Sequence, residues 1–134
     1  MHEHDEWLRI AREDLKAAKA LLNIELFSAV SYFTQQCAEK SLKGYLAFKQ
    51  HPILKTHDLV KLLEECSLFE TSFKKLLDDS RLLNPYASKF RYPTEHEIPD
   101  FNDAKMAIHH AQKILAFVEF KISLPDTGQT TLLK

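Results

Sequence analysis

The sequence predicts an all-α protein, an antiparallel up-and-down bundle of four to five helices. Only two glycines and five prolines occur in its 134 residues, which leaves long stretches without turn formers. Within those stretches the apolar residues recur at helical spacing. The length and the hydrophobic content of 45% are typical of one globular domain, so we expect a bundle over residues 1–123 and a flexible tail over residues 124–134.

The first two helices are predicted over residues 4–22 and 25–49, with a break near Asn23. Each has one apolar stripe that would face the core, and a charged residue lies in the middle of each stripe, Asp14 in the first and Lys40 in the second. A lone buried charge is costly, whereas a hydrogen-bonded pair is tolerated. We therefore predict that Asp14 and Lys40 meet inside the bundle as a structural polar core, with ligand sensing as the alternative role.

Two shorter helices are predicted next, over about residues 58–66 and 69–84. The first begins where Thr56 or Asp58 can cap the free amides, and Pro85 ends the second.

The segment 85–101 carries three prolines and is predicted as an extended loop. After it, Asp100 or Asn102 caps a last helix of roughly twenty residues, which Pro125 closes.

The last helix carries apolar side chains opposite its core stripe, namely Met106, Phe117 and Phe120. Because exposed apolar patches mark interfaces, we expect a partner surface there, used in a homodimer or with another protein. The second helix also has a second apolar row, which a central, doubly packed helix would explain.

The charge balance excludes a basic field over the whole protein. The chain has 18 Lys and Arg against 19 Asp and Glu, so any phosphate-binding site must be a local cluster. The start of the chain is acidic, and no run of about 18 apolar residues occurs, so we expect a cytoplasmic protein without a membrane segment.

The cysteines and histidines give no metal-site pattern. Cys37 and Cys66 have neither a metal-ligand nor a disulfide-framework spacing and are predicted to be reduced core residues. His109 and His110 lack the i, i+4 spacing of helical zinc sites, and histidines near a chain end rarely form a closed site. We expect no metal and no cofactor.

The predicted loop supplies the candidate ligand-binding residues. Lys89, Arg91 and Tyr92 bring two cations and an aromatic ring to one segment, which suits a phosphate with a stacked base. Arg81 approaches from the preceding helix. Alternatively, the aromatic ring packs on the bundle and Arg91 pairs with neighbouring acidic residues.

His57 lies at a predicted helix entry, beside Asp58. A catalytic or ligand-binding role would benefit from Asp58 fixing the tautomer of the ring. The simpler interpretation is that His57 packs and hydrogen-bonds locally to hold the turn.

Four motifs lie in order between residue 7 and about residue 120. They are Trp7-Leu8 with Ala11, Asp14-Leu15 and Ala18; Gln35-Gln36-Cys37-Ala38-Glu39-Lys40-Ser41-Leu42-Lys43; Thr56-His57-Asp58-Leu59; and Arg91-Tyr92-Pro93 before the final helix. Together they resemble the HEPN domain family (higher eukaryotes and prokaryotes nucleotide-binding), and the Gln-Gln stretch is the most specific of them. The resemblance implies a helical bundle, commonly dimeric, similar to the C-terminal domain of aminoglycoside nucleotidyltransferases. Small prokaryotic members are often encoded beside a minimal nucleotidyltransferase as a toxin–antitoxin-like pair.

Many members of the wider superfamily are metal-independent ribonucleases with an Arg, four to six residues and then a His. Arg91 and His96 fit this spacing. A guanidinium can hold a phosphate while an imidazole moves the 2′-hydroxyl proton, in a site completed across a dimer. However, Tyr92 and Pro93 intervene and Pro99 precedes the last helix, so the two residues fall in a loop.

The sequence therefore predicts a protein that binds a nucleotide or RNA phosphate and acts with a minimal nucleotidyltransferase. The alternatives are a metal-independent dimeric endoribonuclease that uses Arg91 and His96, and a non-catalytic protein-interaction module.

Overall fold

The computed structural model describes residues 2–87 and 98–125. In these ranges the chain forms α1 (Glu3–Asn23), α2 (Phe27–Phe48), α3 (Leu59–Phe69), η1 (Thr71–Leu76), α4 (Leu77–Leu83), η2 (Asn84–Ala87) and α5 (Phe101–Ser123), where η denotes a 3-10 helix. No strand occurs in the described part of the chain. The predicted all-α fold is therefore confirmed.

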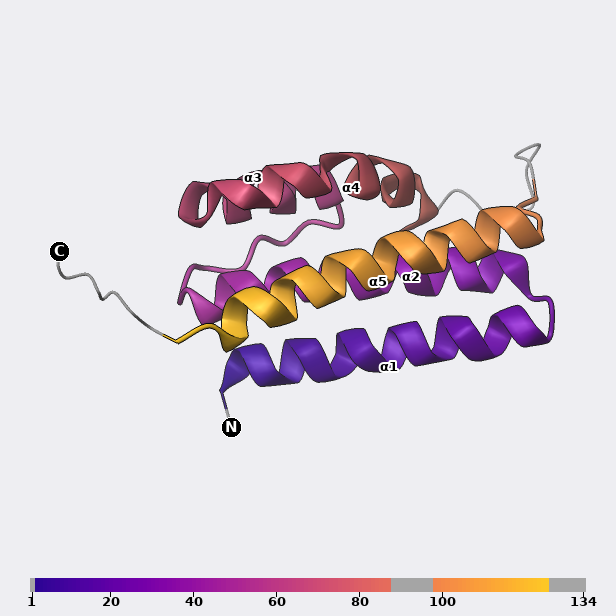
Figure 1. The fold of residues 1–134 in the computed structure, drawn as a ribbon, viewed down its shortest axis with the longest axis horizontal. Coiled ribbons are helices and arrows are strands. Elements are labelled where there is room, and N and C mark those ends of the chain that lie inside the picture. The colour runs from indigo at the N-terminus through magenta and orange to yellow at the C-terminus, as the bar shows by residue number, and fades with distance from the viewer. Residues whose placement is uncertain (1, 88–97, 126–134) are drawn as a thin grey trace, which may run out of the picture.

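The helices form two layers (Figure 1). The long helices α1, α2 and α5 lie side by side; α1 runs antiparallel to both α2 and α5, and α2 and α5 run parallel to each other, so the predicted up-and-down order does not hold for this pair. The shorter α3 and α4 pack on α2 and α5, on the side away from α1. Helix α2 is thus covered from both directions.

The central position of α2 explains its second apolar row. Ala38, Leu42, Tyr45 and Leu46 are all buried, which confirms that this row packs inside the protein. Gly44 lies where α1 crosses closely, because a Cβ at this position would come within 3.2 Å of the Trp7 Cβ.

Two helix starts are set by aspartates, as predicted. Asp58 caps α3 by accepting a hydrogen bond from the Val60 amide at 2.9 Å, while Thr56 Oγ1 accepts from the Asp58 amide. Asp100 caps α5 by accepting from the Asp103 amide at 2.8 Å, and the Asp103 carboxylate accepts in return from the Asp100 amide.

The region predicted as one helix over 69–84 is divided into η1 and α4. Phe73 and Leu76 are both fully buried, and their i, i+3 spacing suits the tighter turn of a 3-10 helix. The chain then continues into η2 rather than entering an extended loop at Pro85. A proline near the start of a helical turn is tolerated, because the first amides there have no partner within the turn.

The prediction that Phe117 belongs to an exposed partner surface on α5 is wrong. Phe117 is partly buried and packs edge-on against Phe73, with ring centroids 4.9 Å apart. Met106 and Phe120 are exposed, at 52% and 57%. Phe117 turns inward because η1 covers this side of α5.

Within residues 2–87 and 98–125, none of the helices has both the length and the apolar run that crossing a bilayer requires.

Candidate functional site

Asp14 and Lys40 are partly buried on the neighbouring helices α1 and α2, but the predicted ion pair between them is not formed. Lys40 Nζ donates to Gln36 Oε1 at 2.6 Å, one turn earlier on its own helix. Asp14 Oδ2 is buried and has no hydrogen-bond partner among the described residues. Burial raises the pKa of Asp14, and the nearby Lys40 charge only partly opposes this shift. Gln36 replaces Asp14 as the acceptor because i, i+4 side chains meet on one helix face.

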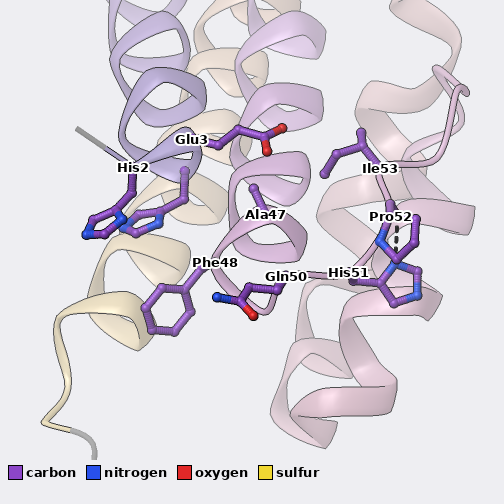
Figure 2. Close-up of a pocket in the computed structure, with 9 residues that line it drawn as sticks. His2, Glu3, Ala47, Phe48, Gln50, His51, Pro52 and Ile53 are labelled. Atoms are coloured by element: carbon purple, nitrogen blue, oxygen red, sulfur yellow. Dashed lines mark hydrogen bonds between the residues drawn. The ribbon is translucent and has the colours of Figure 1, made fainter.

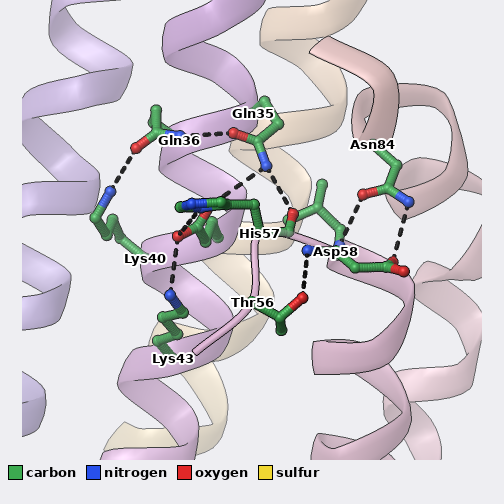
Figure 3. Close-up of polar contacts among 10 residues, drawn as sticks. Gln35, Gln36, Lys40, Lys43, Thr56, His57, Asp58 and Asn84 are labelled. Carbon is green, nitrogen blue, oxygen red and sulfur yellow. Dashed lines mark hydrogen bonds and ion pairs between the residues drawn. The ribbon is translucent and has the colours of Figure 1, made fainter. Parts of the chain in front are cut away.

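A polar network instead centres on Glu39, whose side chain is 2% exposed (Figure 3). Lys43 Nζ donates to Glu39 Oε2 at 2.9 Å, and the His57 ring nitrogen Nδ1 lies 3.0 Å from Glu39 Oε1. Gln35 Nε2 lies 3.4 Å from the same Oε1 and donates to the His57 carbonyl oxygen at 3.1 Å. The network joins α2 to the segment that precedes α3.

Glu39 is held in its charged form. Burial raises the pKa of its carboxyl group, but the hydrogen bonds from Lys43 and His57, with their charges, outweigh burial, and the pKa lies below its usual value. Glu39 is therefore a carboxylate at neutral pH.

His57 differs from both interpretations of the sequence. Its side chain is 75% exposed, so it does not pack into a turn. Its hydrogen-bond partner is Glu39, 18 residues earlier, and not Asp58, which caps α3 and accepts from Asn84. Because a carboxylate only accepts hydrogen bonds, Nδ1 carries the hydrogen of this contact and Nε2 remains for other partners.

Sequence reasoning did not single out Glu39 or Gln35 as site residues. The signal was present in the i, i+4 spacing of Gln35, Glu39 and Lys43, which puts three polar residues on one face of a helix that is otherwise buried. The contribution of His57 depends on tertiary placement and has no such local signal.

Arg81 lies on α4 and lines a groove of about 600 Å³ between α3 and the η1–α4 segment. The groove is walled mainly by apolar side chains and has two cations and one carboxylate among its lining residues: Val60, Leu63, Glu64, Ser67, Leu68, Thr71, Lys74, Leu77 and Arg81. Arg81 and Lys74 are exposed, and neither forms an ion pair with another residue in the described ranges. Both charges are thus available to a ligand.

A second groove, of about 770 Å³, lies between the start of α1 and the end of α2 (Figure 2). Three histidines line it, His2, His4 and His51. His51 Nδ1 is 2.6 Å from the Pro52 carbonyl oxygen, and its Nε2 is 3.2 Å from Glu65. Among the residues that the structure describes, no three His, Cys, Asp or Glu side chains are grouped so as to hold a metal ion.

Both cysteines are buried free thiols, as predicted. Burial raises the pKa of Cys37 to about 12, so this thiol is protonated at neutral pH and is a poor nucleophile.

Four of the residues singled out in the sequence, Lys89, Arg91, Tyr92 and His96, lie outside the described residues. The phosphate-binding segment and the Arg-x4-His spacing therefore remain predictions.

A family model and one of the similar solved structures name the same family. The model of the HEPN domain matches residues 4–121. The fold is similar to the crystal structure of TT1696 from Thermus thermophilus, with a TM-score of 0.83 and 29% identity over 90% of this chain and 99% of that one. It is also similar to ST0689, an archaeal HEPN homologue, with a TM-score of 0.75 and 25% identity over 92% of this chain and 100% of that one. No curated protein matches the sequence. The chain therefore belongs to the HEPN domain family.

Proposed function

We propose that this protein binds a nucleotide or an RNA phosphate and acts with a minimal nucleotidyltransferase, as a homodimer in the cytoplasm, in a toxin–antitoxin-like pair. The observation that carries the proposal is the groove at Arg81, in which two cations without an ion-pair partner in the described ranges lie beside apolar walls.

The groove has the chemistry that a nucleotide requires. The planar Arg81 guanidinium can bind a phosphate through two parallel hydrogen bonds, and Lys74 adds a second positive charge. Leu68 and Leu77 offer an apolar surface to a base. Glu64 can accept a hydrogen bond from a sugar hydroxyl but would repel a phosphate, so it favours one orientation of the ligand.

Lys89, Arg91 and Tyr92 follow η2 in the chain and would add two cations and a ring to the same ligand. A phosphate held by Arg81 and by this segment would be bound from two elements. We therefore treat the groove and the segment as one proposed site.

The exposed apolar residues of α5 support the proposal of a protein partner. Met106 and Phe120 are more than half exposed, and covering them would remove apolar surface from water.

Titration of the purified protein with GMP, ATP and a short RNA, followed by calorimetry and by NMR shifts, tests the proposal. We expect Arg81→Gln to weaken binding by at least about tenfold, because a charge-assisted hydrogen bond contributes about 1.5–3 kcal/mol. Arg9→Gln is the matched control, since Arg9 already pairs with Glu6 and Glu13 on α1. Absence of binding by the wild type, or equal affinities of wild type and Arg81→Gln, would contradict the proposal.

A further inference from the structure

The His57 imidazole combines exposure with a fixed position. Its side chain is 75% exposed, yet Glu39 holds Nδ1 at 3.0 Å and Gln35 holds the backbone carbonyl at 3.1 Å. An exposed ring gains little from packing, because most of its surface stays in water. The network thus holds in place a side chain that the core does not need.

Glu39 has other donors besides His57. Lys43 donates to it at 2.9 Å, and Gln35 lies 3.4 Å from it. The contact with His57 helps to lower the pKa of Glu39 and also fixes the position of the imidazole. A carboxylate that accepts from Nδ1–H fixes the tautomer and orientation of the ring and puts the lone pair on Nε2, where it can act as a nucleophile.

The surroundings of the His57 ring favour a role in which it accepts a transferred chemical group over a role as a catalytic base. Neither of the two grooves described above includes His57, so neither would hold a small substrate against it. A second molecule can instead bring a group donor to a nucleophile that lies on an open surface. The ring extends across α2 toward the side where Gln36 and Lys40 lie (Figure 3). Among the described residues, the hydrogen bond of Lys40 goes to the neutral Gln36 amide, which does not neutralise its positive charge, and the Asp14 carboxylate lies near that charge.

We propose that Nε2 of His57 is a phosphoryl-acceptor site, positioned by Glu39, for donors of the acyl phosphate or phosphoramidate class. The Nε2 lone pair attacks phosphorus, the N–P bond forms, and the bond from phosphorus to the leaving group breaks. The leaving group departs with that electron pair, as a carboxylate from an acyl phosphate or as ammonia from a phosphoramidate whose nitrogen is already protonated. The imidazole keeps its Nδ1 hydrogen and becomes positively charged, and the Glu39 carboxylate compensates this charge.

Incubation of the protein with potassium phosphoramidate, followed by intact mass and peptide mapping, tests the proposal. We expect one phosphoryl group on His57, stable to base and labile to acid, with a 31P signal of the Nε2 isomer. His57→Gln should lose the label. His109 is the internal control, because it is exposed and the structure gives it no carboxylate partner among the described residues.

The role of Glu39 is tested by the rate of labelling. We expect Glu39→Gln to slow phosphorylation of His57 at least about tenfold without changing the rate at His109. If this variant does not fold, the test is the ratio of the phosphorylation rates of His57 and His109 in the wild type. We expect His57 to react at least about tenfold faster. Equal rates at the two histidines, or an unchanged rate in folded Glu39→Gln, would overturn the proposal.

Discussion

Asn84 Nδ2 donates to Asp58 Oδ1 at 3.0 Å, although the two residues are 26 positions apart in the chain. Asn84 Oδ1 also accepts from the Leu59 amide at 2.8 Å. The same Asp58 oxygen accepts from the Val60 amide at 2.9 Å. These hydrogen bonds connect the start of η2 to the start of α3. The residue just before Asp58 is His57, which hydrogen-bonds Glu39.

We predict that Asn84→Ala lowers the free energy of unfolding by about 1–2 kcal/mol, because it removes two hydrogen bonds and leaves the Leu59 amide without its acceptor. Urea unfolding followed by circular dichroism measures the loss. The control is Asn23→Ala, at an exposed position at the end of α1, which should change the value by less than about 0.5 kcal/mol. Equal midpoints for the two variants would contradict the assigned role of Asn84.

Asp14→Asn should stabilise the protein at neutral pH, by about 1 kcal/mol, because the wild type buries a carboxylate oxygen with no partner among the described residues. The folded-state pKa of Asp14 is raised by burial. Asp14 therefore destabilises the wild type least below its pKa in the unfolded chain, about 4. This advantage is lost as the pH rises through the pKa of Asp14 in the folded protein.

The gain from Asp14→Asn should accordingly be largest near pH 7 and shrink toward about pH 4. Urea midpoints across this range measure it. Glu6→Gln, an exposed carboxylate on the same helix, should give no such gain. A loss of stability in Asp14→Asn at pH 7 would show that the charge of Asp14 is compensated after all.

The sequence was sufficient to predict the features below, which depend on residues close together in the chain. Helical spacing and turn formers predicted α1, α2, α3 and α5 to within a few residues, whereas the helix predicted over 69–84 is divided into η1 and α4. The caps at Asp58 and Asp100 depend on residues within three positions. The doubly packed face of α2 was visible because burial on two sides leaves two apolar rows. Local rules of this kind do not need the tertiary structure.

The candidate site was predicted less well because it depends on distant contacts. Lys40 lies at the centre of an apolar stripe, and the pattern could not show that Gln36 would be its acceptor rather than Asp14. The bond between Glu39 and His57 arises only when the segment before α3 folds back over α2. No periodicity within either segment predicts that contact.

We predict that Gly44→Ala is destabilising, by about 1 kcal/mol, although alanine is the better helix former by a similar amount. The new Cβ would lie 3.2 Å from the Trp7 Cβ and 3.3 Å from Leu8 Cδ2. Leu8 can move its side chain, but the Trp7 Cβ moves only with the backbone of α1. Thermal unfolding measures the change, and Gly44→Ser should cost more. A higher melting temperature for Gly44→Ala would show that α1 can shift without loss.

The alternative proposal of a dimeric ribonuclease makes a separate prediction about Arg91 and His96. Under the binding function proposed here, wild type and His96→Ala should both leave RNA intact at concentrations where the wild type binds it. The reason is an expectation from the sequence: Tyr92, Pro93 and Pro99 predict a loop around Arg91 and His96, and a loop would not fix the guanidinium and the imidazole relative to each other as a helix would. Gel analysis of a labelled RNA, with chelator present, measures cleavage, and His109→Ala controls for loss of a histidine elsewhere. Cleavage by the wild type and by His109→Ala but not by His96→Ala would make the ribonuclease the better assignment, since only a proton-transferring His96 accounts for that pattern.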